Sequence, residues 1–450
     1  MKPRGELPGG PYLVVGLARS GAAAALALRA RGEQVIGVDE SAPKGSQALV
    51  EAGVECHQNE NGVALLERVK TIVKSPGVPG EAPVIAAARA RGVEVLGELE
   101  LGWRMLLNEF VAVTGTNGKT TTVELIGHIH REAGLPVAVA GNVGAAVSGL
   151  VGKVDDRATI VCEVSSFQLE DTVAFAPEAA VLLNLTPDHL DRHGTLDRYL
   201  AAKLEIFARQ GNEDIAVAPL GFGSEIGIPP IPGCGRRVCF GEGAGAALSL
   251  SAGELWWEEH PLMGVDEIRL RGRHNVENVM AAAAVCLARG IDTDAVRTGL
   301  RSFVGVRHRL EVVARKKGVL WVNDSKATNV ASTVVALDAM TEKTIRPEKM
   351  IHLILGGQGK AQDFSVLRDP VGRSCRAAYL IGEDAPVLAA ALEGAGVLVH
   401  ECGVLERAVA RAQEAATAGD VVLLSPACAS FDQFADFEAR GERFRELVLG

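Results

Sequence analysis

The stretch "VTGTNGKTTT", residues 113–122, decides how the middle of this chain folds. It follows an apolar run, "FVAV", and precedes a helical segment. Backbone N–H groups of a glycine turn at a helix start bind phosphate oxygens, and the helix dipole favours their charge. In such a loop Lys119 would neutralise the outer phosphates and the Thr120 hydroxyl would hold Mg²⁺. Val113 stands where the first glycine of the usual motif belongs, so an ordinary strand-to-helix turn is the alternative.

A second turn of nucleotide-binding character lies near the start of the chain. "GLARSG", residues 16–21, has Ala18 where the dinucleotide fingerprint requires a glycine. Asp39 ends the next apolar run, where an acidic ribose ligand would stand. The pattern leaves three readings open: an NAD site, a Rossmann-like turn for another ligand, and a turn that binds nothing.

Composition favours a multidomain α/β protein. The chain has 450 residues, of which 48% are hydrophobic and only 4% are aromatic, with 51 glycines. Such a length predicts two to four domains, and such a balance suits α/β layers. The net charge of -10, with no basic block, argues against a nucleic-acid surface or a polybasic membrane patch.

Eight scattered cysteines include no CxxC pair, which predicts reduced thiols and a cytoplasmic protein. The first residues contain too short an apolar core for a signal peptide. We found no run of roughly 18 apolar residues, the length that a membrane span needs.

Short apolar runs alternate with Ala-rich helical stretches, a pattern typical of parallel sheets with crossover helices. We predict three domains: a Rossmann-like domain at 1–100, a central phosphate-loop ATPase-like domain with a mostly parallel sheet at 101–305, and a Rossmann-like domain at 306–450. Within the central domain, residues 247–260 predict a small antiparallel patch.

The third segment holds four predicted strands, at 319–324, 350–357, 377–384 and 420–427. Ligands of such sheets bind beyond the carboxyl ends of the strands. We therefore expect a site built from Asp324, Gly356–Gly357 and Ser425–Ser430.

Two further stretches carry candidate metal ligands. Glu163 ends an apolar strand in "CEVSSFQLED", where a carboxylate can hold Mg²⁺ or its water, although an acidic strand end is often only solvated. "NLTPDHLDRHG" packs five polar residues together: Asn184, Asp188, His189, Asp191 and His193. Zinc sites can have this composition, but no HExxH or CxxC supports one.

Lysine and asparagine side chains complete the candidates. Lys203 lies four residues after Tyr199 on one helical face, where a snorkelling surface lysine is the plain alternative. Asn275 and Asn278 could face a nucleotide base. Arg309 lies near a segment junction, where a cation can reach phosphate bound by another domain.

Taken together, these motifs resemble the Mur ligases, the ATP-dependent amide ligases of peptidoglycan synthesis, over the whole chain. The stretches that carry the resemblance are "TGTNGKTTT", "GNVG", "EVSSFQLE", "DHLDRHG", "YLAAKLEIF", "HNVEN", "RHRLE", "NDSKATN", "GGQGKAQDF" and "SPACASFDQF". "NDSKATN" and "SPACASFDQF" look like the member that adds D-glutamate. The resemblance gives each nucleotide-like turn its own ligand, UDP of a sugar substrate for the first and ATP for the second.

For the chemistry, the resemblance implies ligation of D-glutamate to UDP-N-acetylmuramoyl-L-alanine through an acyl phosphate, with two Mg²⁺ ions and no stable partner subunit. The implied catalytic residues are Lys119, Glu163, His189 and Lys203. Thr120, Glu163, His189 and a carbamylated Lys203 would hold the metal ions. The implied ATP contacts are Gly115, Thr116, Asn117, Gly118, Lys119, Thr120, Thr121, Asn275, Asn278, Arg309, Asp324 and Lys326.

Substrate contacts follow in the same way. The implied contacts of the UDP-sugar are Arg19, Ser20, Asp39, Ser75, Gly77, Asn142, Ser165 and Gln168. The implied contacts of D-glutamate are Thr328, Lys360, Ser430 and Phe437. Ser41 and Phe431 depart from the family pattern.

Three other functions fit part of the sequence. A dehydrogenase would explain "GLARSG" and Asp39 but not the second loop. A phosphate-loop switch or small-molecule kinase would explain Lys119 and Glu163 but not the third segment. A nucleotide-sugar binding protein without chemistry would not need Lys119 for its activity.

Overall fold

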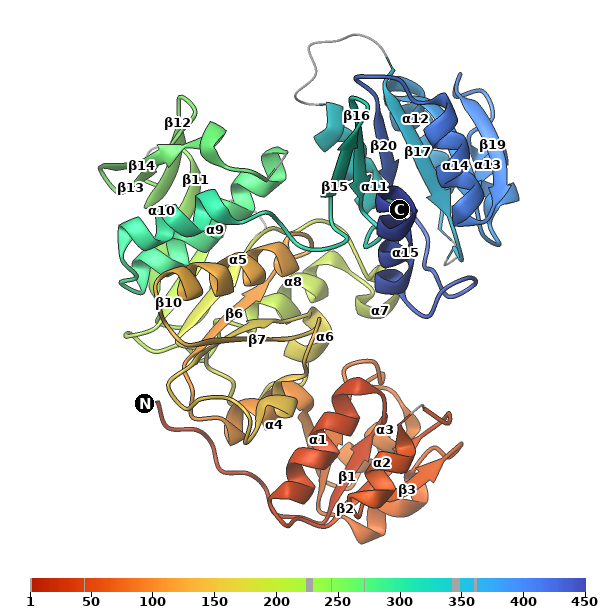
Figure 1. Ribbon diagram of the computed structural model, residues 1–450. Helices are drawn as coiled ribbons and strands as arrows, with labels where there is room; N and C mark the ends of the chain where they lie inside the picture. Colours follow the sequence, from red (N-terminus) through yellow and green to blue (C-terminus); the bar gives the residue numbers. More distant parts are fainter. Residues whose placement is uncertain are drawn as a thin grey trace. The chain divides into compact units, whose positions relative to one another are not determined.

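A computed structural model describes residues 2–43, 45–223, 230–243, 245–270, 272–341, 349–359 and 362–450, without the side chains of Leu190 and Asp191. Within these residues three β-sheets are present (Figure 1). The chain forms two compact units. The first unit comprises Met1–Ile268 and Glu277–Ser302, and the second comprises Arg269–Val276 and Phe303–Gly450.

The first sheet has five parallel strands in the order β3-β2-β1-β4-β5. Its elements are β1 (Tyr12–Val15), α1 (Arg19–Ala30), β2 (Val35–Asp39), α2 (Ser46–Glu51), β3 (Glu55–Gln58), a 3₁₀ helix (Val63–Arg68), β4 (Thr71–Lys74), α3 (Pro83–Ala90) and β5 (Glu94–Gly97). The strand order reverses between β1 and β4. In open parallel sheets a ligand crevice forms at such a reversal, beyond the carboxyl ends of the strands.

The second sheet has nine strands in the order β14-β13-β12-β11-β10-β9-β6-β8-β7. Its strands are β6 (Phe110–Thr114), β7 (Val137–Gly141), β8 (Thr159–Glu163), β9 (Ala179–Leu182), β10 (Ile215–Pro219), β11 (Arg236–Glu242), β12 (Leu248–Ser251), β13 (Glu254–Trp257) and β14 (His260–Gly264). Strands β6 to β12 run parallel to one another in this sheet. The pairs β12–β13 and β13–β14 are antiparallel. The predicted antiparallel patch is confirmed.

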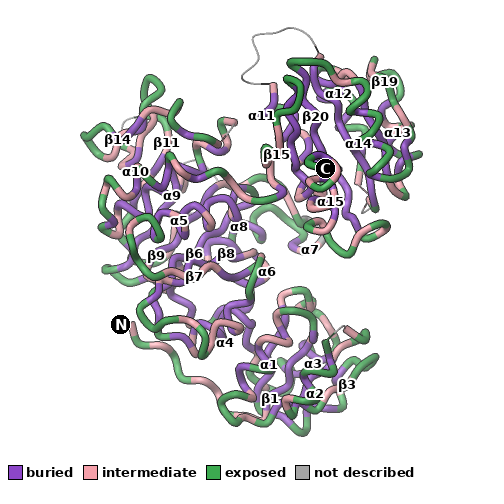
Figure 2. The backbone as a smooth tube through the Cα atoms, in the orientation of Figure 1, coloured by how far each residue is buried: buried purple, intermediate pink, exposed green. Residues whose placement is uncertain are grey.

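Several helices belong to the central part: α4 (Glu98–Met105), α5 (Lys119–Glu132), α6 (Ser166–Leu169), α7 (Leu190–His193), α8 (Leu196–Leu204), α9 (Arg273–Ala288) and α10 (Thr293–Ser302), with 3₁₀ helices at Val147–Leu150 and Val265–Glu267. Strand β6, "FVAVT", is buried along its whole length because parallel strands are covered on both faces. Its neighbours and α5 are likewise buried (Figure 2). This buried sheet fixes the start of the phosphate loop.

The third sheet, in the second unit, has the order β15-β16-β20-β17-β18-β19, in which only the β15–β16 pair is antiparallel. Its elements are β15 (Glu311–Lys316), β16 (Val319–Asn323), α11 (Val330–Thr341), β17 (Ile351–Gly356), a 3₁₀ helix (Phe364–Leu367), α12 (Arg368–Ser374), β18 (Cys375–Ile381), α13 (Ala385–Ala391), β19 (Leu398–Gly403), α14 (Leu405–Ala415), β20 (Val421–Leu424) and α15 (Phe437–Leu449). Two apolar clusters pack on its opposite faces, one with α11 and α12 and one with α14 and α15.

The predicted α/β class and the four strands of the third segment are confirmed. The sequence did not reveal β3, β5, β7, β14, β15 and β19, which lie at sheet edges, nor β10 and β11, which lie inside the second sheet. Strand β3, "ECHQ", is exposed at both ends and has no apolar run to mark it. The predicted domain limits of 1–100, 101–305 and 306–450 stay a prediction, because the first two sheets share one compact unit.

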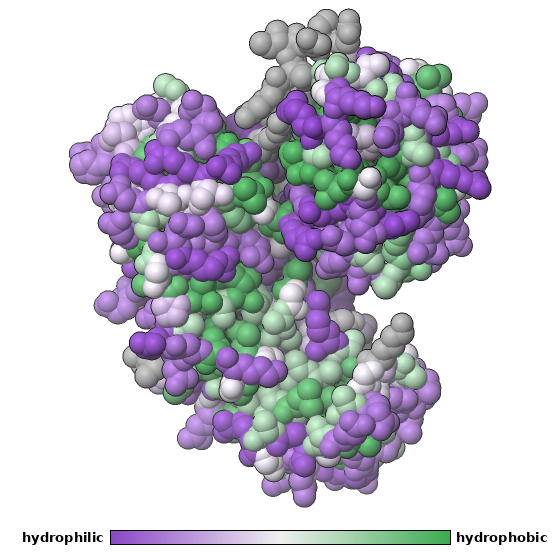
Figure 3. All heavy atoms as spheres, viewed as in Figure 1, coloured by the Kyte–Doolittle hydropathy of each residue, from purple (hydrophilic) through white to green (hydrophobic). Residues whose placement is uncertain are grey.

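All eight cysteines are free thiols. None of the helices in the described ranges has the length and apolar character that a bilayer span requires. Polar side chains cover much of the face shown in Figure 3.

Candidate active site

The phosphate loop joins β6 to α5, as the sequence predicts. Gly118 caps α5 with a φ of 87°, and Gly115 has a φ of 152°. A side chain at Gly118 would be strained at this φ, and its Cβ would lie 2.0 Å from the Asn278 Oδ1 atom unless Asn278 moved. The glycines thus allow a tight turn that ends at the start of α5, and helix starts of this kind bind phosphate.

Two lysines converge on the carbonyl of Gly115. Lys119 donates from Nζ to the carbonyl oxygens of Gly115 and Thr116, each at 2.9 Å, and Lys203 donates to Gly115 O at 2.8 Å. Lys203 is only 1% exposed, and its Nζ atom lies 4.3 Å from the centre of the Tyr199 ring. The interpretation of Lys203 as a snorkelling surface residue is therefore wrong, because α8 turns this face toward the loop.

Burial changes the chemistry of Lys203. Removal from water, and secondarily the neighbouring charge of Lys119, lower the pKa of its amine to about 6, against an opposing effect of Asp188. Near neutral pH this side chain is therefore mostly a neutral amine, which is a nucleophile rather than a cation.

A chain of hydrogen bonds links the phosphate loop to the end of β7. The Thr120 hydroxyl donates to Glu163 Oε2 at 2.6 Å, and Asn142 Nδ2 donates to Glu163 Oε1 at 2.9 Å. Glu163 is buried at the end of β8, and the adjacent Gly141 approaches it so closely that a Cβ would lie 2.1 Å from the Glu163 carbonyl oxygen. The structure thus brings Thr120, Glu163 and Asn142 together.

The first sheet contributes residues to the same region of this unit. Arg19, at the start of α1, donates from Nη2 to the main-chain oxygen of Asn142 at 3.1 Å. Asp39 accepts hydrogen bonds from the Leu17 amide at 2.7 Å and from the amide and hydroxyl of Ser41. Burial favours a higher pKa for Asp39, but these hydrogen bonds outweigh it and lower the pKa below its usual value. Asp39 therefore braces the first turn as an ionised carboxylate.

Ser75 and Gly77 follow β4, on the other side of the strand-order reversal from the Gly16 turn. The Ser75 hydroxyl donates to Gly16 O at 2.7 Å, so the two turns of the crevice are joined. Lys74, the residue before Ser75, is buried, and its ammonium pairs with Asp171 at 2.6 Å. This ion pair connects the turn after β4 to the central part of the unit. Ser20 lies in the first turn of α1.

Ser165 and Gln168, both predicted substrate contacts, form the N-terminal cap of α6. The Ser165 hydroxyl accepts from the Gln168 amide, and Gln168 Oε1 accepts from the Ser165 amide at 3.0 Å. Gln168 is buried, and the capping hydrogen bonds occupy its side-chain oxygen. Its contact with substrate stays a prediction.

His189 lies in a left-handed conformation, with φ of 51°, immediately before α7. Its side chain is half exposed, 4.9 Å from the ring of Phe167 and 6.4 Å from that of Tyr199. Non-glycine residues with such backbone angles are strained and often stand at functional sites. Its neighbour His193 is buried between Ser166, at 3.0 Å, and Glu170, at 3.1 Å.

Asn278 and Asn275 are both buried on α9. Asn278 lies against Gly118 and hence beside the phosphate loop. Thr121 is buried in the first turn of α5. Asn275 belongs to the segment assigned to the second unit, and its predicted base contact is untested.

Within the second unit, the predicted strand-end site is assembled. The Asp324 carboxylate accepts from Ser425 Oγ at 2.8 Å and from the Leu310 amide at 3.1 Å. Gly357 lies so near the loop after β20 that a Cβ would be 2.2 Å from Ala429 O. Burial raises the pKa of Asp324 to about 7, although Ser425 and Arg309 oppose the shift.

Three of the four residues predicted for D-glutamate, Thr328, Ser430 and Phe437, lie in or directly after the loops that follow β16 and β20. Lys326 Nζ lies 5.6 Å from the ring centre of Phe437, and the hydroxyl of Ser325 donates to Phe437 O at 2.8 Å. Ser430 is buried in the loop after β20, and Thr328 follows β16. Lys360 lies outside the described residues, so its predicted role is untested.

Two residues with structural roles at these sites were missed from the sequence. Arg440 is fully buried and donates to main-chain oxygens of Ser325, Gly356 and Cys428, so it holds three strand-end loops together. A single arginine in an amphipathic helix carries no sequence signal for this role. Asn184 was considered only as one residue of a polar stretch, but its side chain binds the phosphate loop. Its position directly after the apolar run of β9 could have indicated a place near that loop.

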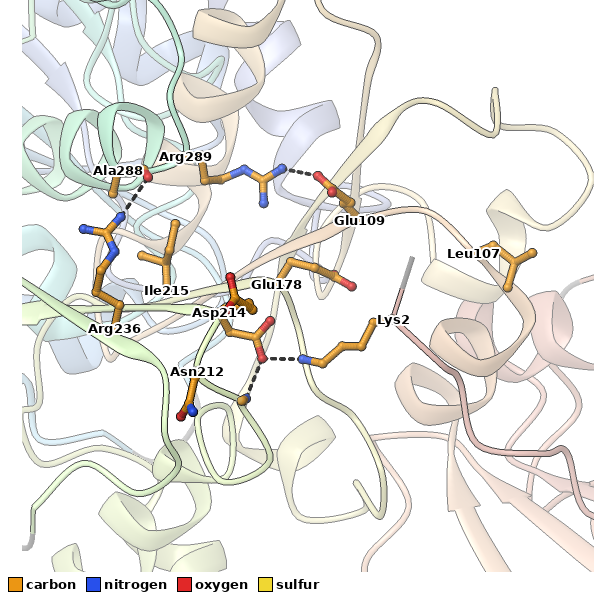
Figure 4. Close-up of a pocket in the computed structure, with 12 residues that line it drawn as sticks. Lys2, Leu107, Glu109, Glu178, Asn212, Asp214, Ile215, Arg236, Ala288 and Arg289 are labelled. Atoms are coloured by element: carbon orange, nitrogen blue, oxygen red, sulfur yellow. Dashed lines mark hydrogen bonds and ion pairs between the residues drawn. The ribbon is translucent and has the colours of Figure 1, made fainter.

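A cavity of about 640 Å³ lies elsewhere in the first unit (Figure 4). Its lining residues Glu109, Glu178 and Asp214 precede β6, β9 and β10, so it opens at the amino ends of these strands. Its charges are largely paired, with Lys2 on Asp214 and Arg289 on Glu109 at 2.5 Å. Parallel α/β sheets bind ligands at the opposite edge, where the phosphate loop lies.

Comparisons with known proteins agree with this architecture. Three family descriptions match: the MurD-like N-terminal domain of Mur ligases at residues 11–97, the Mur ligase middle domain at 113–225, and the glutamate ligase domain of Mur ligases at 308–428. Among solved structures, UDP-N-acetylmuramate-alanine ligase MurC from Thermotoga maritima has a TM-score of 0.63 at 18% identity, covering 98% of this chain and 99% of that one. MurF ligase from the same organism, in complex with ADP, has a TM-score of 0.60 at 18% identity over 92% of this chain and 93% of its own. These likenesses show the fold.

Sequence relatives extend over nearly the whole chain. The UDP-N-acetylmuramoylalanine–D-glutamate ligase of Acidobacterium capsulatum is 42% identical over 99% of this chain and 97% of its own length. Proteins with the same name from Anaeromyxobacter dehalogenans, 42% identical over 98% of both chains, and Gloeobacter violaceus, 40% identical over 97% of this chain and 98% of its own, are similar to it as well. The chain therefore belongs to the Mur ligase family, on the branch whose curated relatives carry the name UDP-N-acetylmuramoylalanine–D-glutamate ligase.

Proposed function

We propose that this protein joins D-glutamate to UDP-N-acetylmuramoyl-L-alanine with consumption of ATP, a step of peptidoglycan precursor synthesis. The full-length relatives are named for this ligation. The observation that carries the proposal for this chain is the hydrogen-bond chain from the phosphate loop through Thr120 and Glu163 to Asn142. It links a triphosphate site to the loop proposed to place the acceptor carboxylate.

The residues at the phosphate loop suit Mg²⁺. A hydroxyl, on Thr120, and a carboxylate, on Glu163, lie 2.6 Å apart, and oxygen donors of these kinds are the ligands that Mg²⁺ prefers. His189 is the proposed ligand for a second ion. When bound, Mg²⁺ neutralises the negative charge of the ATP phosphates.

The proposed reaction begins with two anions, ATP and the carboxylate of the sugar-linked alanine. A carboxylate oxygen attacks the γ-phosphorus, forming a C–O–P bond while the bond to the ADP oxygen breaks. Lys119 stabilises the charge that develops on the phosphoryl oxygens, and we assign the same task to Arg309 of the second unit. The role of Lys119 follows from its position over the loop, with Nζ 2.9 Å from Gly115 O.

In the second half, the amine of D-glutamate attacks the activated carbonyl carbon. The C–N bond forms, the amine loses a proton, the C–O bond breaks and phosphate departs. We propose that Thr328, Lys360, Ser430 and Phe437 hold D-glutamate. The burial of Ser430 and the Lys326–Phe437 contact support a built site at these strand ends. The remaining ATP contacts proposed in the second unit are Asn275, Asp324 and Lys326.

Lys203 is proposed to carry a carbamate. Its neutral amine can attack CO₂, forming an N–C bond and releasing one proton, which converts the side chain into a carboxylate-like anion. The shift of its pKa to about 6 supports this reaction, because only the neutral amine has the lone pair for it. An anion at this position would lie near the Lys119 ammonium, because both lysine side chains contact Gly115 O.

For the nucleotide sugar, we propose that its diphosphate and uridine lie at the crevice of the first sheet, against Arg19, Ser20, Asp39, Ser75 and Gly77. Arg19 is the cation of this set and already contacts the Asn142 main chain. Asn142, Ser165 and Gln168 are proposed for the muramoyl end. The link from Arg19 to Asn142 supports one continuous substrate path within the first unit.

ATP-dependent phosphate release tests the proposal. Purified protein is given ATP, Mg²⁺ and UDP-N-acetylmuramoyl-L-alanine, and the release is compared with D-glutamate, L-glutamate, L-lysine and diaminopimelate. We expect release only with D-glutamate, together with one mole of amide product for each mole of phosphate. Release without the sugar substrate, or equal release with every amino acid, would refute the assignment.

A further inference from the structure

Asn184 makes an unusual set of contacts with the phosphate loop. Its Oδ1 atom accepts hydrogen bonds from the Thr116 amide at 3.2 Å and from the Asn117 amide at 2.9 Å. Its Nδ2 atom donates to Asn117 O at 3.1 Å. One side-chain amide thus contacts three main-chain groups of two consecutive loop residues.

The orientation of this amide is fixed by its partners. The oxygen faces two N–H donors and the nitrogen faces a carbonyl, so exchanging the two atoms would lose all three hydrogen bonds. The main chain strengthens the same junction, because the Thr116 amide also donates to Asn184 O at 3.2 Å. Thr116 Oγ1 further donates to Thr186 O and accepts from the Thr186 amide, both at 3.1 Å.

Lys119 supplies two hydrogen bonds to the loop, to the carbonyl oxygens of Gly115 and Thr116, and contacts from β9 add to this support. Residues 115–118 follow a buried strand in irregular conformation, with Gly115 and Gly118 both at positive φ. Glycines have the largest conformational freedom to lose, so a glycine loop is ordered only by external contacts. Asn184 is half-buried at the end of β9, the strand adjacent to β6, and so provides a rigid point of attachment.

We infer that Asn184 is a positioning residue for the phosphate loop: it orders Thr116 and Asn117 so that the remaining amides of the loop and of α5 are directed toward phosphate before ATP binds. It acts through the loop, because its amide hydrogens and oxygen are directed at main-chain groups of the loop. The inference rests on the proposed function only in that the loop is taken to bind ATP.

The test compares Asn184→Ala with a matched control in the same unit, Asn108→Ala. Asn108 is buried, more so than the half-buried Asn184, and donates two side-chain hydrogen bonds to main-chain oxygens, of Asp155 and Ala158, each at 2.8 Å. It lies before β6, at the opposite end of this strand from the phosphate loop. Calorimetry measures the dissociation constants of Mg-ADP and of UDP-N-acetylmuramoyl-L-alanine for wild type and both variants.

For Asn184→Ala we expect Mg-ADP to bind on the order of tenfold more weakly, equivalent to about 1.4 kcal/mol, since several hydrogen bonds that order the loop are lost. Binding of the nucleotide sugar should stay within about twofold of wild type. Asn108→Ala should lower thermal stability without changing either dissociation constant. A general loss of stability would affect both ligands alike, so the difference between the two ligands identifies the positioning role.

Asn184→Asp adds a second criterion. It keeps the oxygen that accepts from Thr116 and Asn117 but places a negative charge beside the phosphate site. Its loss of Mg-ADP affinity should exceed that of Asn184→Ala at low salt, and the excess should shrink at high salt, where charges are screened.

The inference is overturned if Asn184→Ala binds Mg-ADP as tightly as wild type, or if Asn108→Ala weakens it equally. Failure of the proposed function gives a different result: wild type would bind Mg-ADP but form no amide, and the ADP affinities would still report on Asn184. Conversely, an active wild type with an unaffected Asn184→Ala variant would leave the function standing and remove Asn184 from it.

Discussion

Carbamylation of Lys203 can be tested directly, because the structure predicts which lysine reacts. A lysine with the ordinary pKa of 10.5 is only ~0.1% neutral at about pH 7.5, whereas one with a pKa of about 6 is ~97% neutral. The nucleophilic form is thus enriched roughly 1000-fold by burial and by the Lys119 charge. Among the side chains that the structure describes, no carboxylate forms an ion pair with Lys203 that would restore its charge.

The assay is ¹³C NMR of protein equilibrated with ¹³C-bicarbonate at about pH 7.5. We expect one carbamate carbon resonance per chain, resolved from bicarbonate. Lys203→Gln should abolish it, and Lys153→Gln, which removes an exposed lysine, should leave it unchanged. Ligase activity should fall in the first variant and persist in the second.

The pH dependence has a defined direction. Because the folded-state pKa of Lys203 lies below its unfolded value, the amine gains a proton only as the pH falls through about 6. The carbamate resonance should decline in that range, since a protonated amine has no lone pair for CO₂. A resonance that persists in Lys203→Gln, or the absence of any resonance in wild type, would refute the reasoning.

Four further substitutions test other parts of the structure. Lys119→Met should lower kcat/KM at least ~100-fold in the phosphate-release assay, because it removes the cation at the phosphate loop. Glu163→Gln should raise the Mg²⁺ concentration for half-maximal activity roughly 10–100-fold, measured by titration after chelation of the metal. Lys74→Met should lower the free energy of unfolding by about 3–5 kcal/mol in urea, since it leaves the buried Asp171 with only the more distant, half-exposed Arg89 at 3.8 Å. Replacing Asp171 by Leu as well should recover most of the loss. Asp324, with its pKa raised to about 7, holds a proton that the unfolded chain releases. The free energy of unfolding of wild type should therefore fall as the pH rises from about 4 to about 7. Asp324→Asn should flatten this fall, as measured by urea unfolding at several pH values.

The sequence predicted those parts of the site that depend on local pattern. A strand followed by a glycine loop and a helix predicted the phosphate loop, and Lys119 and Thr120 lie where the motif requires. Short apolar runs identified the buried strands. Edge strands such as β3 were missed because exposure on the sheet edge allows polar residues, which removes the apolar run.

Contacts between distant segments could not be predicted in this way. The Arg440 side chain crosses to loops 84 and 115 residues earlier, at Gly356 and Ser325, and its burial depends on how α15 packs. Asn184 meets the phosphate loop 67 residues away, because β9 and β6 are neighbours in the sheet although two strands separate them in the chain. The packing of α15 decides the role of Arg440, and sheet order decides the role of Asn184.

The same sheet order explains how one unit can join two nucleotide-like turns. Arg19 touches the Asn142 main chain, the Asn142 side chain touches Glu163, and Glu163 touches Thr120 at the start of α5. Glu163 is therefore shared: one carboxylate oxygen faces the proposed substrate loop and the other faces the proposed metal site. A substrate that moves Asn142 should change the hydrogen bonding of Glu163 and thereby the affinity for the metal nucleotide. Linkage then requires that the metal nucleotide change the affinity for the substrate by the same factor. A single buried carboxylate thus connects the two turns by hydrogen bonds, and we expect it to couple binding at the proposed substrate loop to binding at the proposed metal site.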